Sequence, residues 1–105
     1  MDEYIQVFSS VINQNGAEEL AESLITKKLA AIVQITGPVK TMYMWNEKIL
    51  KGEDWRLVIK TTRGLYEKLE AEIKRLHPYG VPEILAVPVL EGNRDYLKWI
   101  SRELS

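Results

Sequence analysis

The sequence has 105 residues, so a single domain spanning residues 1–105 is expected, and a two-domain enzyme is excluded. A hydrophobic fraction of 46% and a charged fraction of 28% are typical of a folded soluble protein and exclude a disordered chain. Fourteen basic and fifteen acidic residues give a formal net charge of −1, and there is no cysteine, so we expect no nucleic-acid partner, no disulfide framework and no thiolate metal site.

The N-terminal residues lack the basic and apolar regions of a signal peptide. No apolar run approaches the ~20 residues of a membrane span. We therefore expect a cytoplasmic protein without a membrane partner.

The first half of the chain alternates between strand and helix patterns. Residues 4–11 are rich in aromatic and β-branched side chains and predict a strand, which a loop ending in Asn15-Gly16 follows. A helix is predicted from Asn15, as its N-cap with Glu18 in a capping box, to about Lys28. Residues 30–45 predict one long strand that is bent at Gly37-Pro38.

Asn46-Glu47 is a turn signal, after which the chain is expected to return briefly through Ile49, turn again at Lys51-Gly52-Glu53, and form a third strand over residues 55–62. Apolar residues at helical spacing predict a helix over residues 64–76, which Pro78 ends. A fourth strand is predicted over residues 83–90 and a C-terminal helix over residues 96–104.

This βαββαβ order predicts an α+β fold, a ferredoxin-like sandwich with an additional C-terminal helix. Its two main helices can cover only one face of the four-stranded antiparallel sheet. The runs at residues 30–33 and 84–87 carry apolar side chains toward both faces, so we expect a homo-oligomer that covers the second face. The alternative is a monomer whose tryptophans belong to the core.

Five short motifs occur in a fixed order along the chain, and together they resemble the CutA family of divalent-cation tolerance proteins. They are Tyr43-x-Trp45, Ile59-Lys60-Thr61, His77-Pro78-Tyr79, Val81-Pro82-Glu83 and Asp95-Tyr96-Leu97-Lys98-Trp99. The resemblance implies a compact cytosolic homotrimer, similar in assembly to the PII signalling proteins, with clefts between its subunits. It also implies a non-catalytic role in divalent cation (copper) tolerance or signalling.

The chain departs from the family pattern at four positions, one of which is Asp54, a shorter carboxylate where the family usually carries glutamate. Ser9 stands where copper-binding members carry a cysteine, and Ile32 stands where many members carry a second one. Glu47 replaces the glycine of the family's Trp-x-Gly turn. Because a hydroxyl is a poor ligand for a soft metal, we expect no required cofactor and only weak binding of a divalent metal such as copper.

His77 is the only histidine and hence the only imidazole available to a ligand. It has three interpretations: it ends the second main helix, it contacts a ligand in a cleft, or it binds a metal weakly together with Asp54. Lys60 lies late in a central strand, opposite the core face, and is expected to meet Asp54, Glu83 or a bound anion.

Met42 and Met44 share one face of a strand, as a Cu(I) thioether pair would, but core or interface packing is the preferred interpretation. The sequence has no Gly-rich phosphate loop, nucleophile elbow or zinc-hydrolase spacing, so no enzyme is predicted. We expect an inter-subunit cleft that binds a small ligand or a metal ion; the alternatives are a structural or partner-binding trimer without a metal role and a PII-like small-molecule sensor. The candidate cleft residues are Trp45, Asp54, Lys60, His77, Tyr79 and Glu83.

Overall fold

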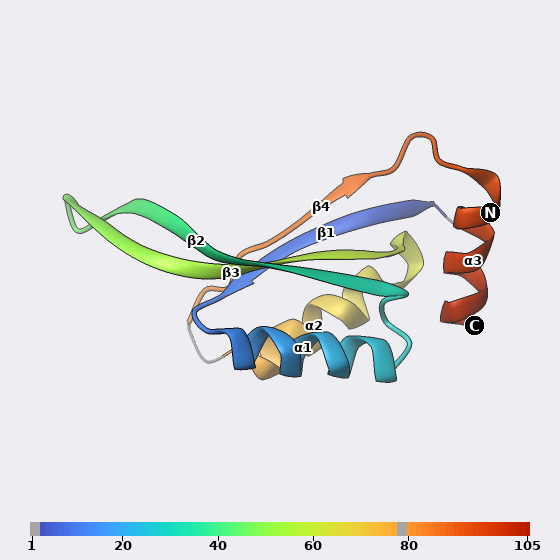
Figure 1. Ribbon diagram of the computed structural model, residues 1–105, viewed down its shortest axis with the longest axis horizontal. Coiled ribbons are helices and arrows are strands. Elements are labelled where there is room, and N and C mark those ends of the chain that lie inside the picture. The colour runs from blue at the N-terminus through green and yellow to red at the C-terminus, as the bar shows by residue number, and fades with distance from the viewer. Residues whose placement is uncertain (1–2, 78–79) are drawn as a thin grey trace.

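The computed structural model describes residues 3–77 and 80–105 (Figure 1). Its elements are β1 (Tyr4–Val11), α1 (Gln14–Thr26), β2 (Ile32–Trp45), β3 (Lys48–Thr62), the 3₁₀ turn η1 (Arg63–Leu65), α2 (Tyr66–Leu76), β4 (Ile84–Pro88) and α3 (Arg94–Leu104). The predicted element order and α+β class are confirmed. Among the described residues, no helix is long and apolar enough to cross a membrane.

The four strands form one sheet in the order β2-β3-β1-β4, and each neighbouring pair is antiparallel. β1 and β2 therefore run in the same direction with β3 between them, which is the split βαβ arrangement that the sequence predicts. α1 and α2 lie side by side on one face of this sheet, and α3 lies at its end (Figure 1).

The core lies between the sheet and the α1/α2 layer. Alternate residues of β1 and β3 point into it, with Val7, Leu57 and Ile59 fully buried, and Leu24 of α1 and Leu69 of α2 meet them from the helices. The strands alternate with a period of two, and α1 and α2 have apolar residues at helical spacing. The apolar face of the sheet therefore packs against the apolar faces of the two helices.

The opposite face of the sheet, which we call the open face, stays partly apolar. In β4, Ile84 and Ala86 point to the core face, whereas Leu85 and Val87 point to the open face. Leu85 is 63% exposed and Val87 is 39% exposed in a single chain. The prediction that β4 carries apolar side chains toward both faces is therefore confirmed, although the strand ends at Pro88 rather than residue 90.

The third strand is seven residues longer at its start than the sequence predicts. Asn46 and Glu47 close a two-residue turn with φ values of 49° and 64°, and β3 begins at Lys48. Trp45 pairs with Lys48, and the ladder continues through Gly52 opposite Thr41. The predicted turn at Gly52 is wrong because the chain has already reversed, and a glycine inside a strand only weakens it.

The resulting β2–β3 hairpin reaches well beyond the helices (Figure 1). The predicted bend in β2 is confirmed, since its register with β3 shifts between Thr36 and Val39. Gly37 lies there because a Cβ would come within 2.3 Å of the Trp55 ring. The hairpin is therefore anchored to the sheet where Trp55 covers the bend.

The N-cap of α1 is Asn13 rather than the predicted Asn15. Its Oδ1 accepts the Gly16 N–H at 2.6 Å, while its backbone is extended. This bond satisfies an N–H that the first helical turn leaves without a helical partner, so the helix begins two residues earlier than expected. Asn15 lies inside the first turn.

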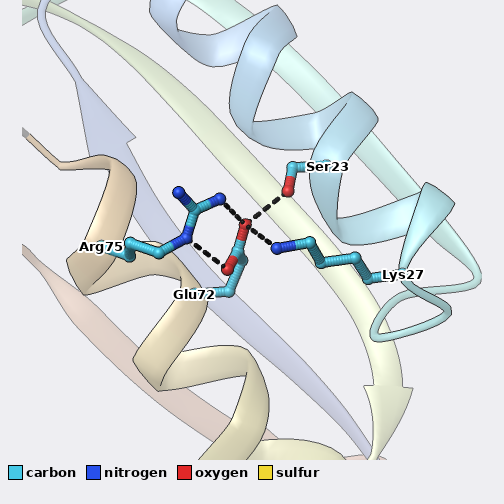
Figure 2. A network of polar contacts seen from close by, with 4 residues as sticks. All are labelled: Ser23, Lys27, Glu72 and Arg75. Carbon is cyan, nitrogen blue, oxygen red and sulfur yellow. Dashed lines mark hydrogen bonds and ion pairs between the residues drawn. The ribbon is translucent and has the colours of Figure 1, made fainter.

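A buried carboxylate joins the two main helices (Figure 2). Glu72 of α2 accepts hydrogen bonds from Arg75 Nη2 at 2.6 Å, from Ser23 Oγ at 2.5 Å and from Lys27 Nζ at 3.0 Å. Arg75 and Ser23 hold the pKa of the Glu72 carboxyl well below its usual range, against the opposing effect of its burial. Glu72 thus stays ionised, and it links α2 to the last turns of α1.

Candidate functional site

A small pocket, the His77 pocket, opens where β1 ends beside the end of α2. Its volume is about 160 Å³. It is lined by Ser10, Val11, Ile12, Asp54, His77, Val81 and Glu83. Three of the six predicted cleft residues, Asp54, His77 and Glu83, therefore lie at one place within a single chain.

His77 joins the end of α2 to β1. Its backbone N–H donates to the Ile73 carbonyl at 2.9 Å and its own backbone is extended, so it is the C-cap of the helix. Its ring Nε2 lies 3.2 Å from the Ser10 carbonyl oxygen. A carbonyl oxygen only accepts, so this contact needs a proton on Nε2. The helix-end interpretation of His77 is confirmed, and the same position puts its ring in the pocket.

Glu83 is held by two neighbours that the sequence analysis did not select. Its Oε1 accepts from Ser10 Oγ at 3.1 Å, and its Oε2 pairs with Arg56 Nη2 at 3.2 Å. Ser10 pairs with Arg56 across β1 and β3, on the open face. Strand alternation places Arg56 on that face, and its charge is the signal that could have identified it as the partner of Glu83.

Asp54 lies on the same side of β3 as Arg56 and opposite Val39 of β2. It supplies the pocket with a second carboxylate beside Glu83. Among the described residues, no group of three His, Asp or Glu side chains could hold a metal ion. One chain therefore offers a pocket lined by an imidazole and two carboxylates, of which Glu83 is paired with Arg56.

Lys60 lies elsewhere in the chain. Its Nζ donates to the Gln34 side-chain oxygen at 2.9 Å, so neither expected salt bridge, to Asp54 or to Glu83, is formed. Lys60 lies six positions after Asp54 on β3, which corresponds to roughly 20 Å at about 3.3 Å per residue. The two side chains cannot contact one small ligand within one chain.

Trp45 ends the β2 strand at the tip of the hairpin and is 63% exposed. Met42 and Met44 are also exposed, so core packing, one of their two preferred interpretations, does not occur within one chain. Tyr79 lies outside the described residues. Of the predicted cleft, the structure thus brings three members together and places Lys60 and Trp45 at two other points.

The two positions at which the family resemblance implied cysteines face opposite sides of the sheet. Ser9 is fully buried on the core face, opposite Leu57, and Ile32 pairs with Lys60 on the open face. Among buried side-chain atoms of the described residues, Ser9 Oγ alone has no hydrogen-bond partner. A pair of thiols at these positions could not bind one metal ion within a chain.

Comparisons with known proteins agree on one family. The family model described as CutA1 divalent ion tolerance protein matches residues 5–103. The chain is 38% identical over 94 residues to the divalent-cation tolerance protein CutA of Thermus thermophilus, covering 90% of this chain and 91% of that one.

Two further matches carry a compartment in their printed names. A rice relative, named Protein CutA 1, chloroplastic, is 38% identical over 96 residues, which cover 91% of this chain and 54% of that protein. A solved structure described as the periplasmic divalent cation tolerance protein CutA of Archaeoglobus fulgidus superposes with a TM-score of 0.94 at 29% identity, covering 97% of this chain and 99% of that one.

Proposed function

The chain belongs to the CutA1 divalent ion tolerance protein family, and on that basis we propose that it is a non-catalytic homotrimer that binds a divalent cation or a small ligand at the His77 pocket. The observation that carries this proposal is the meeting of His77, Asp54 and Glu83 in one pocket. The names of its relatives describe tolerance proteins and not enzymes.

Exposed apolar side chains support assembly. They gather on the hairpin and on β4, and they are Met42, Tyr43, Met44, Trp45, Ile49, Leu50, Leu85 and Val87. This many exposed large apolar side chains on a small domain indicate a protein partner, and a second and third copy of the chain are the simplest one. We propose that the hairpin of a neighbouring subunit brings its Trp45 against the His77 pocket and makes it an inter-subunit cleft.

The pocket suits a cation better than an anion. Two carboxylates line the pocket and only Glu83 pairs with a guanidinium, that of Arg56, and the imidazole of His77 can bind a metal ion through an unprotonated ring nitrogen. Arg56 already neutralises Glu83, which leaves Asp54 and His77 as the proposed cation ligands. Two ligands from one chain give weak affinity, and the loss of both family cysteines reduces affinity for copper further.

Calorimetric titration with Zn²⁺ and Cu²⁺ tests the cation site. Asp54→Asn and His77→Gln should each weaken binding about tenfold or more, and Asp95→Asn, at an exposed carboxylate of α3, should leave it unchanged. Wild-type affinity should fall as acid protonates the imidazole, because the proton competes with the metal. Equal affinity in all three variants would refute the site.

The second candidate is a structural trimer without a metal role, or a PII-like sensor of a small molecule. It is favoured by the absence of any three-residue metal group among residues 3–77 and 80–105. Native mass spectrometry separates these functions. A mass three times 12.1 kDa with bound metal supports the first, and the same mass without metal at millimolar Zn²⁺ supports the second. A monomer mass contradicts both.

We also propose a cytoplasmic location, although the rice and Archaeoglobus relatives carry the names of other compartments. Fractionation of the native host, with detection by antibody, tests this location. Recovery from a periplasmic or organellar fraction would contradict it.

A further inference from the structure

The start of α1 places a chemically reactive dipeptide beside the helix cap. The sequence has four asparagines, and Asn15 alone is followed by a glycine. An asparagine side chain reacts most readily with the backbone when glycine follows it, because glycine has no Cβ to hinder the approach of its nitrogen. The N–H of this glycine, Gly16, is also the group that donates to Asn13 Oδ1 at 2.6 Å. The reactive dipeptide and the helix cap therefore share one nitrogen atom.

The short capping bond favours glycine at residue 16. A Cβ there would lie 3.1 Å from Asn13 Oδ1 and 3.8 Å from a methyl carbon of Val11. The first distance is shorter than an ordinary van der Waals contact, so any other side chain would push the acceptor away from the N–H that it caps. The chain thus carries an Asn-Gly dipeptide as a consequence of how α1 begins.

Deamidation of this dipeptide needs the Gly16 nitrogen to reach the Asn15 side chain. The nitrogen bonds to Asn15 Cγ, its proton passes through water to the departing side-chain nitrogen, and ammonia leaves as a succinimide ring closes. A water molecule then opens the ring at either carbonyl and leaves aspartate or isoaspartate at residue 15. Water is the only other reactant, so the reaction depends on no cofactor, ligand or partner chain.

The folded start of α1 opposes this reaction. The Gly16 N–H points at Asn13 Oδ1, an amide oxygen that accepts the bond but is too weak a base to remove the proton. Both residues of the dipeptide lie inside α1, and the Cβ of a helical residue is tilted toward the start of the helix. This tilt carries Asn15 Cγ away from the nitrogen that follows it. The Asn13 carbonyl also accepts the N–H of Ala17, which is fully buried, so the reaction has to wait until this turn opens.

We propose that Asn15 is a deamidation site and that the Asn13 cap keeps it unreactive in the folded protein. The rate in the folded chain is then the rate in an open chain multiplied by the fraction of molecules in which the first turn of α1 is open. Loss of a side-chain cap raises that fraction about fivefold or more.

The two products affect α1 differently. Aspartate keeps a helical backbone, and its negative charge is favourable in the first turn of a helix. Isoaspartate adds a carbon atom to the backbone and interrupts the helical hydrogen bonds. Because Val11 and Ile12, which line the His77 pocket, directly precede the cap, this damage lies beside that pocket.

The test stores the intact protein at mildly alkaline pH in H₂¹⁸O and then measures residue 15 by peptide mass spectrometry. Products formed during storage contain ¹⁸O, which separates them from deamidation during digestion. A synthetic peptide of residues 11–20 supplies the rate for an open chain. The wild-type protein should react about tenfold more slowly than the peptide or slower still, because its first turn is mostly closed.

Two variants and a matched control assign the protection to the cap. Asn13→Ala should speed the reaction at Asn15 about fivefold or more, whereas Asn13→Asp keeps an oxygen acceptor and should stay close to the wild-type rate. Asn93→Ala is the control, because Asn93 caps α3 in the same way, through the Tyr96 N–H at 3.1 Å, and should leave the rate at Asn15 unchanged. The proposal is overturned if the wild-type protein reacts as fast as the peptide, if Asn13→Asp reacts as fast as Asn13→Ala, or if Asn13→Ala and Asn93→Ala change the rate equally.

Discussion

Glu72→Gln tests how much the carboxylate between α1 and α2 contributes to stability. The substitution keeps the shape of the side chain and removes the charge that Arg75 and Lys27 contact. Glu72 is 8% exposed, whereas Lys27 and Arg75 are 48% and 58% exposed. Lys27 and Arg75 stay hydrated when the carboxylate is removed. The loss in the free energy of unfolding should therefore stay below the roughly 3–5 kcal/mol that an unpaired buried charge costs. We expect a loss of about 1.5–3 kcal/mol in the free energy of unfolding.

The same substitution predicts a pH dependence. The pKa of Glu72 is lower in the folded chain than in the unfolded one, so the unfolded chain takes up the proton first as pH falls. The stability that Glu72 supplies is complete above the unfolded value of about 4.3, and it is lost as pH falls from there toward the folded-state pKa. The difference between wild type and Glu72→Gln should be constant from about pH 8 to about pH 5 and shrink below about pH 4.

Urea unfolding at one fixed protein concentration measures both effects, because assembly would otherwise change the apparent stability. Glu22→Gln is the control: Glu22 is an exposed carboxylate of α1 without an ion pair among the described residues. It should change stability by less than about 0.5 kcal/mol. A loss equal to that of the control, or a difference that does not shrink in acid, would refute the reasoning.

Three further substitutions test local features by urea unfolding under the same conditions. Ser9→Ala removes the buried hydroxyl that lacks a partner and should raise the free energy of unfolding by about 1 kcal/mol, and a clear loss would show that the hydroxyl is bonded. Glu47→Gly relieves a left-handed backbone with φ of 64° and should stabilise the hairpin by about 1 kcal/mol, and no gain would show that the turn carries no strain. Gly37→Ala forces a Cβ into the Trp55 ring and should cost about 1–3 kcal/mol; an unchanged stability would mean that the ring moves freely.

Much of the fold follows from local patterns. Aromatic and β-branched content predicts the strand at residues 4–11. In the third strand Lys60 is expected opposite the core face, and Leu57 and Ile59 on the other face are buried. The return of the chain after residue 45 was predicted, because Asn46-Glu47 is a turn signal, whereas Gly52 suggested a second turn that does not occur. Turn geometry at a non-glycine residue depends on the pairing of the flanking strands, which a local pattern does not contain.

The candidate site was predictable only in part. His77 and Glu83 follow α2 in the sequence, and Asp54 is brought to them by the pairing of β1 with β3 and β4. The role of Glu72 could not be read from the sequence, because its partners Ser23 and Lys27 lie on another helix. Glu72 is buried because α1 packs on α2; it is not one of the apolar residues whose helical spacing predicts the buried face of α2.

The long β2–β3 hairpin gives the protein two optical reporters with different meanings. The sequence has three tryptophans, and Trp45 lies exposed at the hairpin tip while Trp55 packs against the core and Gly37. Indole emission moves to longer wavelength as water reaches the ring, so Trp55 reports unfolding of the chain. Trp45 reports instead whatever covers the tip, and dilution of an assembled protein should shift its emission while that of Trp55 stays constant.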